Sequence, residues 1–369
     1  MLVFLRLAVP CAITAESFVV RRTMPHHSVA PAGAHSLAGK HCVVTGANSG
    51  LGYATASALL SRGASVVLAC RRPDAAEAAA RSLRLAHPGA SVSTAELDLT
   101  SLSSVGRFAT TYVASGVPLH CLCNNAGCNF WDKPPAAPST ADGYGVCAQA
   151  NFLGAACLTL LLAPALLRAA PSRVVFVGSA THRSGSLRAG GTARFLCSWK
   201  HGQYGDAKLA GVAFSFEADR RLRPRGVRCV SVDPGAVQSN IWAGTPLGGP
   251  RVAALMDRLY APCDDGSQAI VHACAASLDE ARGPSPGGGE LYFARGLFAR
   301  GPVTWDSWLP QPVWSVCALA ASLADWPARG LLGGATRAVA ASPMALDRRL
   351  GEELWGAAAA AVGLAPDAI

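Results

Sequence analysis

The sequence predicts an α/β fold: a single domain on a doubly wound parallel sheet of about seven strands flanked by helices, with extensions at both ends. Short apolar segments alternate with longer Ala- and Leu-rich segments from residue 41 to about 295. The short segments are almost continuously apolar, as in 173–178, which is typical of strands buried on both faces. A glycine cluster lies directly after the first of them. With 369 residues, 51% of them hydrophobic, the chain can bury one large core.

The predicted strands are short and rich in apolar residues. In chain order they are 41–45, 65–70, 91–97, 118–123, 173–178, 227–232 and 290–293. A helix is predicted between each strand and the next, which favours parallel pairing with helices on both faces of the sheet.

The predicted helices are longer, and their apolar residues recur with helical spacing. They cover 51–61, 74–86, 101–114, 144–169, 204–222 and 264–277, and a final helix is predicted in 350–363. We expect Asp74 to cap the start of the second helix, and Pro164 to bend the fourth.

The ends of the chain are predicted to be separate segments. Residues 1–38 are predicted to be a targeting or anchor segment followed by a linker. A membrane-spanning helix is not predicted there, because no apolar stretch reaches the roughly 18–20 residues of a bilayer span. An untethered arm is the alternative. The main domain is assigned to 39–300 and a C-terminal helix to 344–369. An organellar or endoplasmic-reticulum membrane location is favoured, with a cytoplasmic one as the alternative.

Residues 301–343 read as an apolar, Trp-rich insertion. Trp305, Trp308 and Trp326 flank an uncharged stretch at 312–324, which contains Trp314. Tryptophans beside an apolar helix suit a membrane-surface anchor or a partner surface. A helix packed on the main domain is the alternative.

Charge and cysteine content argue against several classes of function. The net charge is +9, but the basic residues form no stripe with interleaved aromatics, so no nucleic-acid partner is expected. The 13 cysteines contain no C-x-x-C pair and are predicted to be buried free thiols, and no metal site is predicted. The sequence leaves the oligomeric state open.

The glycine cluster predicts a dinucleotide site. In Thr45-Gly-Ala-Asn-Ser-Gly-Leu-Gly52 the glycines let the backbone turn sharply between strand and helix and approach a pyrophosphate. The spacing is G-x-x-x-G-x-G rather than the common G-x-G-x-x-G. The residues assigned to the cofactor are Gly46, Asn48, Ser49, Gly50, Leu51 and Gly52.

Two arginines predict NADP(H) rather than NAD(H). In dinucleotide folds an acidic residue after the second strand binds the ribose 2′-hydroxyl, whereas an arginine accommodates a 2′-phosphate. Here Arg71 and Arg72 follow that strand, and the first acidic residue after the strand is Asp74. Arg71 is the better candidate.

Tyr204 and Lys208 predict acid–base chemistry. They are four residues apart and therefore share one face of a helix. An unperturbed phenol, with a pKa near 10, is a poor base at neutral pH, but a nearby ammonium and a positively charged oxidised nicotinamide both favour its ionised form. An isolated Tyr-x-x-x-Lys is usually a solvated helix face, so the surrounding motifs carry the assignment.

Taken together, these strings resemble the short-chain dehydrogenase/reductase superfamily over residues 40–295, and imply its Rossmann-type fold. Within it, the chain is most similar to the retinol-dehydrogenase-like and protochlorophyllide-reductase-like branch. The strings that carry this are Ala69-Cys-Arg-Arg72, Asn151-Phe-Leu-Gly154 and Asp233-Pro-Gly-Ala-Val-Gln-Ser-Asn240.

The resemblance implies further site residues. Asn151, Ser179, Tyr204 and Lys208 would be the catalytic set, with Ser179 bonding the substrate oxygen and Asn151 helping to hold a water that relays protons to Lys208. Tyr204 and Lys208 would also contact the cofactor. The remaining cofactor residues implied are Asp98, Leu99, Asn125, Ala126, Gly127, Pro234 and Gly235. The sequence departs from the family at Gly178, Ala207 and Phe152, and His182 is open to a structural, substrate-loop or chemical role.

The function predicted is that of an NADP(H)-dependent alcohol dehydrogenase or carbonyl reductase. The substrate expected is a small hydrophobic alcohol or carbonyl compound, because the branch and the apolar stretches 195–199 and 241–247 favour one. A ring C=C reductase of the protochlorophyllide-reductase-like type and a catalytically silent NADP-binding regulator are the alternatives.

Overall fold

The computed structural model describes residues 37–129, 138–198, 203–239, 241, 260–276, 292–295, 336–339 and 341–369. The predicted segment at 1–38 and the predicted insertion at 301–343 therefore lie almost wholly outside the described residues, as does Asn240.

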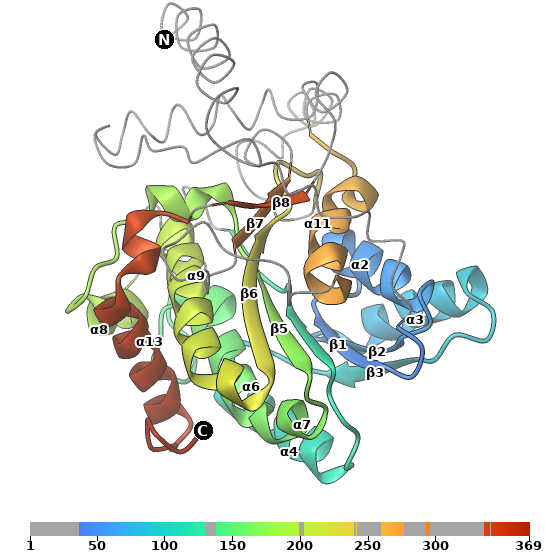
Figure 1. Ribbon diagram of the computed structural model, residues 1–369, viewed down its shortest axis with the longest axis horizontal. Helices are drawn as coiled ribbons and strands as arrows, with labels where there is room; N and C mark the ends of the chain where they lie inside the picture. The colour runs from blue at the N-terminus through green and yellow to red at the C-terminus, as the bar shows by residue number, and fades with distance from the viewer. Residues whose placement is uncertain are drawn as a thin grey trace, which may run out of the picture.

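A single twisted sheet forms the centre of the molecule (Figure 1). Its strand order is β3-β2-β1-β4-β5-β6-β7-β8. The strands are β1 (His41–Thr45), β2 (Ser65–Cys70), β3 (Val92–Glu96), β4 (Cys121–Asn124), β5 (Ser172–Val177), β6 (Val227–Asp233), β7 (Tyr292–Arg295) and β8 (Thr336–Val339). All neighbours through β7 pair in parallel, which confirms the predicted fold class.

An eighth strand, β8, pairs antiparallel with β7 at the edge of the sheet. It lies inside the segment that the sequence assigned to an insertion, and no strand was predicted there. The strand order reverses between β1 and β4, and in open α/β sheets ligands bind at the carboxyl ends of the strands beside such a reversal.

Helices cover both faces of the sheet (Figure 1). One core joins the sheet to α2 (Gly50–Leu60), α3 (Pro73–Ala86) and α11 (Cys263–Ala275). The other joins it to α4 (Leu102–Ala114), α6 (Gly154–Leu161), α9 (Gln203–Leu222) and α13 (Arg348–Ala361). Successive strand residues alternate between the two cores: Cys42 and Val44 point to the first and Val43 to the second.

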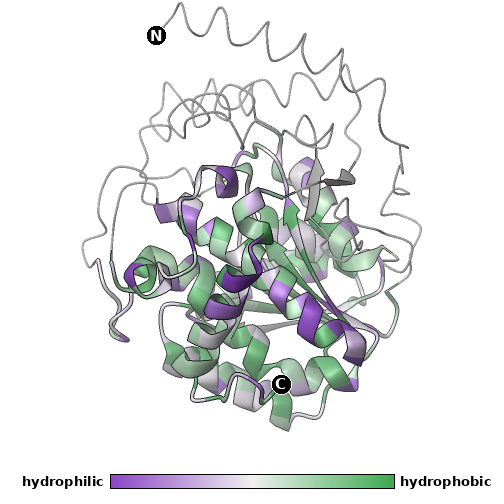
Figure 2. Cartoon of the chain, turned by 60° about the vertical axis from the view of Figure 1, so that its left-hand side comes forward, coloured by the Kyte–Doolittle hydropathy of each residue, from purple (hydrophilic) through white to green (hydrophobic). Residues whose placement is uncertain are grey.

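The helices have a hydrophobic side and a hydrophilic side (Figure 2). In α3, for example, the buried residues Ala76, Ala79, Ala80 and Leu83 recur every three or four positions. Within the described residues, no helix is both long enough and apolar enough to cross a membrane.

Helix α9 is the central helix of its layer, with 17 of its 20 residues buried. Phe214 from α9 stacks on Trp355 of α13 with ring centroids 5.6 Å apart. At its C-terminal end Glu217 pairs with Arg220 and Arg221, and Asp219 pairs with Arg223 and Arg228. These arginines neutralise the two buried carboxylates of the helix.

Two details differ from the sequence prediction. The long helix expected over 144–169 is divided into α5 (Val146–Ala148), a π-helical turn (Gln149–Leu153), α6 and α7 (Ala163–Arg168). The division before α7 agrees with the expected effect of Pro164, which can occupy a first turn but not a helix interior. The expectation for Asp74 was wrong: Arg72 occupies the N-cap of α3, Pro73 follows it, and Asp74 lies in the first turn.

Candidate cofactor and catalytic site

The turn between β1 and α2 has no room for side chains at Gly46 and Gly52. Gly46 has a φ of +66°, and its N–H donates to the Ala69 carbonyl at 2.8 Å. A Cβ at Gly46 would lie 3.0 Å from Ala126, and one at Gly52 would lie 2.5 Å from Asn125 Nδ2 and clash with the Gly46 carbonyl. The glycines therefore permit the close backbone approach that a pyrophosphate site needs.

The first turn of α2 lacks the usual side-chain cap. Ser49 occupies the N-cap without forming a capping hydrogen bond, and no acidic residue lies in the first turn of this helix. Asn48, Gly50 and Leu51 lie around it and are partly exposed. Because the N–H groups at a helix start carry partial positive charge, this geometry fits a cofactor diphosphate.

The loop after β4 is bonded directly to the glycine turn. Asn125 Nδ2 donates to the Thr45 carbonyl at 2.9 Å, while the N–H groups of Asn125 and Ala126 each donate to Thr45 Oγ1 at 3.0 Å. Gly127 is closely packed, since a Cβ there would lie 2.6 Å from Asn151 Oδ1. Thr45 was not among the predicted site residues, yet it joins the two loops that would hold the cofactor.

Arg71 and Arg72 are both exposed at the carboxyl end of β2. Burial raises the pKa of the Cys128 thiol to about 11, and the charge of Arg71 is near enough to act in the opposite direction. Arg71 therefore lies in the neighbourhood of Cys128. Arg72 instead occupies the N-cap of α3. Burial raises the pKa of Cys70, and the charge of Arg72 partly offsets this by lowering it.

Asp98 and Leu99 follow β3, and their side chains lie in different surroundings. Asp98 Oδ1 accepts from the N–H and hydroxyl of Thr100, at 2.9 and 2.6 Å. Ser101, rather than Asp98, caps α4. Leu99 is buried in the core against Gly154, so its side chain is not available to a ligand. Only its backbone could contact a cofactor.

Asn151 lies in the π-helical turn, and its side-chain amide bonds to backbone groups. Oδ1 accepts from the Cys128 N–H at 2.9 Å, and Nδ2 donates to the carbonyls of Cys128 and Cys147, both at 2.9 Å. The Cys147 thiol lies 3.4 Å from the same nitrogen. Asn151 thus fixes the segment after Gly127, a contact that the sequence did not predict.

Ser179, Tyr204 and Lys208 meet where β5 ends beside α9. The Ser179 hydroxyl is near enough to the Tyr204 hydroxyl to lower its pKa. Lys208 Nζ lies 5.5 Å from the centroid of the Tyr204 ring and donates to the Val177 carbonyl at 2.8 Å. Pro234 and Gly235 follow the neighbouring strand β6, where the Gly235 N–H donates to Asp233 Oδ1 at 2.9 Å.

The protein alone keeps the phenol of Tyr204 protonated. Burial raises its pKa above the usual range, and Cys147, Asp233 and Cys128 add to this, while the Ser179 hydrogen bond lowers it. Burial also lowers the pKa of Lys208 to about 8, although Cys128, Cys147 and Asp233 each act to raise it. The phenolate was predicted to be favoured by the ammonium of Lys208 together with the oxidised nicotinamide. In the protein alone, burial of the hydroxyl is the largest influence on the pKa of Tyr204 and acts in the opposite direction.

The family model for short chain dehydrogenases matches residues 40–246, which include the glycine turn, the loop after β4 and the Ser179–Tyr204–Lys208 group. The chain belongs to the short-chain dehydrogenase family. The family is one of oxidoreductases that bind a nicotinamide cofactor.

Similar proteins place this short-chain dehydrogenase in the retinol-dehydrogenase-like branch. It is 41% identical to human dehydrogenase/reductase SDR family member 13 over 212 residues, which are 57% of this chain and 55% of that protein. It is 35% identical to human retinol dehydrogenase 12 over 244 residues, 65% of this chain and 74% of that protein. The match thus spans about half the length of the first relative.

A solved structure of an uncharacterised protein from Mycobacterium Paratuberculosis has a similar fold. Its TM-score is 0.61 at 28% identity, covering 91% of this chain and 98% of that chain. The similarity extends beyond the residues that the family model matches.

Asp206 is a buried carboxylate that sequence reasoning missed. It lies in α9 between Tyr204 and Lys208, and its Oδ1 accepts from the Ser186 N–H at 2.6 Å. It thereby attaches the loop after Ser179 to the helix of this dehydrogenase that carries Tyr204. An acidic residue inside the Tyr-x-x-x-Lys string was the available signal.

His182 is wholly buried and structural. Its Nδ1 bonds to the Ser179 carbonyl at 2.8 Å, and Nε2 accepts from the Ser342 N–H at 3.1 Å. An N–H group can only donate, so Nε2 is unprotonated and Nδ1 carries the hydrogen. Burial, and to a lesser extent Arg183, lowers the pKa of His182 to about 3. It is therefore neutral at physiological pH.

This pKa predicts a pH-dependent stability. The unfolded imidazole binds a proton below about pH 6.5, whereas the folded one stays neutral to about pH 3, so its contribution is present above pH 6.5 and lost on acidification. Between pH 7 and pH 5 we expect wild type to lose about 2 kcal/mol more unfolding free energy than His182→Gln. Urea unfolding of both proteins at the two pH values measures this. Equal losses would contradict it.

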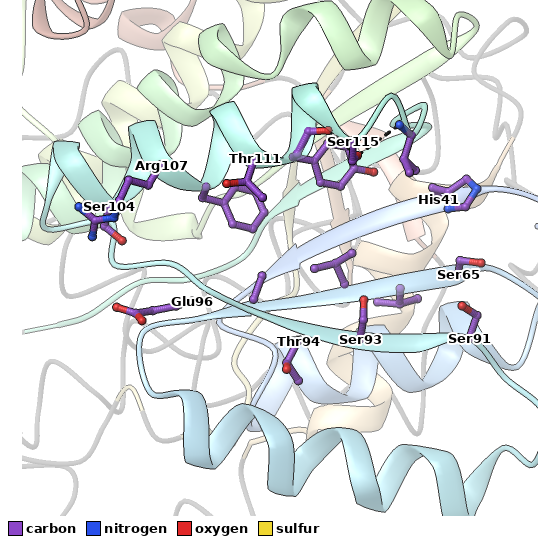
Figure 3. A pocket seen from close by; sticks show the side chains of 16 residues that line it. His41, Ser65, Ser91, Ser93, Thr94, Glu96, Ser104, Arg107, Thr111 and Ser115 are labelled. Carbon is purple, nitrogen blue, oxygen red and sulfur yellow. Dashed lines mark hydrogen bonds between the residues drawn. The ribbon is translucent and has the colours of Figure 1, made fainter.

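A groove of about 540 Å³ opens elsewhere, between α4 and the face of β2 and β3 (Figure 3). Ser93, Thr94, Arg107 and Thr111 are among its lining residues. None of the predicted site residues lines it. The candidate active site therefore remains at the carboxyl ends of the strands, where the side chains described above lie.

Proposed function

We propose that this short-chain dehydrogenase interconverts a hydrophobic alcohol and its aldehyde or ketone with NADP(H), and that Tyr204 is the acid–base group. The observation that supports this most is the grouping of Ser179, Tyr204 and Lys208 at one strand end, together with a turn after β1 that is closely packed at its glycines. When bound, the cofactor would supply or accept the hydride.

The chain's own groups would handle the proton on the substrate oxygen. Tyr204, which is protonated in the protein alone, would donate its hydrogen to a carbonyl oxygen. The Ser179 hydroxyl, next to it, would hydrogen-bond the same oxygen. Lys208, the nearest described cation to the ring, would stabilise the phenolate left behind. Asn151 would keep the loop after Gly127 in place through Cys128.

The names of two relatives support a proposal for the substrate class. Two of the similar proteins are named retinol dehydrogenase 11 and retinol dehydrogenase 12. We therefore propose a retinoid-like or comparably apolar aldehyde, ketone or alcohol. The purified chain should oxidise NADPH with apolar aldehydes, measured by loss of absorbance, and not with sugars of similar size. Turnover with no member of an aldehyde, ketone and alcohol panel would count against the proposal.

Arg71 would set the preference for NADP(H). Its side chain is exposed at the carboxyl end of β2, and a charge-assisted bond to a 2′-phosphate contributes roughly 1.5–3 kcal/mol. We expect Arg71→Ala to weaken NADPH binding by about ten- to a hundredfold and to change NADH binding little. Titration of both reduced cofactors against protein fluorescence tests this, with Arg72→Ala as the neighbouring control. Equal affinity of wild type for the two cofactors would show that the 2′-phosphate is not recognised.

A further inference from the structure

The loop that begins at Ser179 makes close contacts with the last part of the chain. Ser179 is the N-cap of a short 3₁₀ helix, η2 (Ala180–Ser184), and the chain then runs to α8 (Thr192–Cys197). We call residues 179–192 the Ser179 loop. Two hydrogen-bonded contacts join it to residues more than 150 positions later in the sequence.

The first contact runs through His182. The Ser179 carbonyl accepts from the His182 N–H at 3.0 Å and from its ring Nδ1–H at 2.8 Å. The other ring nitrogen accepts from the Ser342 N–H. His182 and Ser342 are both wholly buried, so this chain of bonds is shielded from water. The orientation of the peptide group after Ser179 is thereby tied to the backbone at Ser342.

The second contact runs through Glu353 on α13. Its carboxylate accepts from the Gly190 N–H at 2.7 and 2.9 Å and from the Thr192 hydroxyl at 3.2 Å. Gly190 has a φ of +82°, in the left-handed region that glycine adopts easily. The Ser179 loop is therefore held near both of its ends by the C-terminal segment.

The C-terminal segment is itself firmly anchored. Asp347 caps α13 by accepting from the N–H groups of Arg349 and Leu350. Leu350, Leu354 and Trp355 are buried in the core that α13 shares with α9. A rigid element that is bonded to a loop at two points can fix that loop's position.

We propose that the C-terminal segment 341–361 positions the catalytic loop of this enzyme, with His182 as the positioning residue that transmits this support to Ser179 and Glu353 as the second attachment. The proposal rests on the proposed function, since it assigns the segment a part in that reaction. His182 touches neither substrate nor cofactor in it and acts only through Ser179.

Three substitutions at His182 separate its two bonds. His182→Asn can place an amide nitrogen near Nδ1 and keep the bond to Ser179, whereas His182→Gln can place an amide oxygen near Nε2 and keep the bond from Ser342. His182→Leu removes both. A displacement of about 1 Å at a catalytic group can cost about a hundredfold in rate. We therefore expect His182→Leu to lower kcat about 10- to 100-fold with NADPH affinity changed less than about twofold, and the two amides to fall between Leu and wild type.

The pH dependence of kcat tests whether His182 transfers a proton. Since His182 stays neutral, the folded variants should keep the wild-type shape of the kcat–pH profile at reduced height. A shifted limb in that profile would make His182 an acid–base group and overturn the proposal. So would a kcat within about twofold of wild type in folded His182→Leu, or a loss of kcat that merely follows the folded fraction.

Glu353 supplies a test that does not need activity. Glu353→Gln weakens the contact to Gly190, and Glu352→Gln is the matched control because Glu352 is exposed and pairs with Arg348. We expect faster amide hydrogen exchange across residues 179–192 in Glu353→Gln and no change there in Glu352→Gln. Unchanged exchange in Glu353→Gln would overturn the proposal. Wild-type protein without turnover on the carbonyl panel would instead refute the proposed function, and the exchange result alone would then decide whether the segment holds the loop.

Discussion

Replacing Tyr204 by phenylalanine should lower kcat by about 10²–10⁴-fold while the fold and NADPH binding stay nearly intact. The substitution removes the hydroxyl that would give its hydrogen to the substrate oxygen but keeps the ring. The ring contact with Lys208 Nζ, at 5.5 Å, and the hydrogen bond from Lys208 to the Val177 carbonyl both remain possible. The loss should therefore fall on kcat rather than on cofactor affinity.

Tyr112→Phe is the matched control for this experiment. Tyr112 lies in α4 and lines the groove of Figure 3, away from the carboxyl ends of the strands. Its buried hydroxyl has no hydrogen-bond partner among the described residues. Removing it should leave kcat within about twofold. If Tyr204→Phe kept more than half of the wild-type rate on a confirmed substrate, the assignment of Tyr204 as the acid–base group would be wrong.

Gly52→Ala should abolish measurable cofactor binding and destabilise the protein. A methyl group at this position would clash with the Gly46 carbonyl and lie 2.5 Å from Asn125 Nδ2. Both neighbours belong to the turn and the loop that would enclose the cofactor, so the backbone must shift to accept the new atom. Overpacking of this kind costs typically about 1–3 kcal/mol. NADPH titration by fluorescence and urea unfolding measure the two effects.

Gly106→Ala provides the opposite expectation from the same chemical change. Gly106 lies within α4, and a Cβ there would have nothing within 4 Å. Alanine should stabilise that helix by about 0.5–1 kcal/mol and leave NADPH binding unchanged. If Gly52→Ala bound NADPH as tightly as Gly106→Ala, the close approach at the glycine turn would have no bearing on the cofactor.

The sequence predicted the parts of this fold that depend on local pattern. Strands 41–45 and 65–70 have the predicted bounds, because a buried parallel strand is an uninterrupted apolar run between a turn and a helix. The positions of Ser179 and Gly235 at strand ends also followed from the chain's alternation of elements. The roles of these residues stay predictions until the substitutions above are made.

Contacts between distant parts of the chain could not be predicted in this way. The bond from Ser342 to His182 joins residues 160 positions apart, and nothing near either residue signals the other. The carbonyl partners of Asn151 are equally hidden, because backbone groups have no sequence signature. Strand β8 was missed because its four residues, Thr336–Val339, are too few to show a period.

The packing of α13 against α9 has a consequence for the order in which the protein folds during synthesis. Cys157 bonds to the Ala358 carbonyl across 201 positions, and Phe214 stacks on Trp355. The apolar side of the helix that carries Tyr204 and Lys208 thus stays uncovered until the residues of α13 have left the ribosome. Contacts of such high sequence separation form slowly, and exposed apolar surface invites aggregation meanwhile. A nascent chain stopped before residue 348 should therefore depend on chaperones, although it already contains every residue assigned to catalysis.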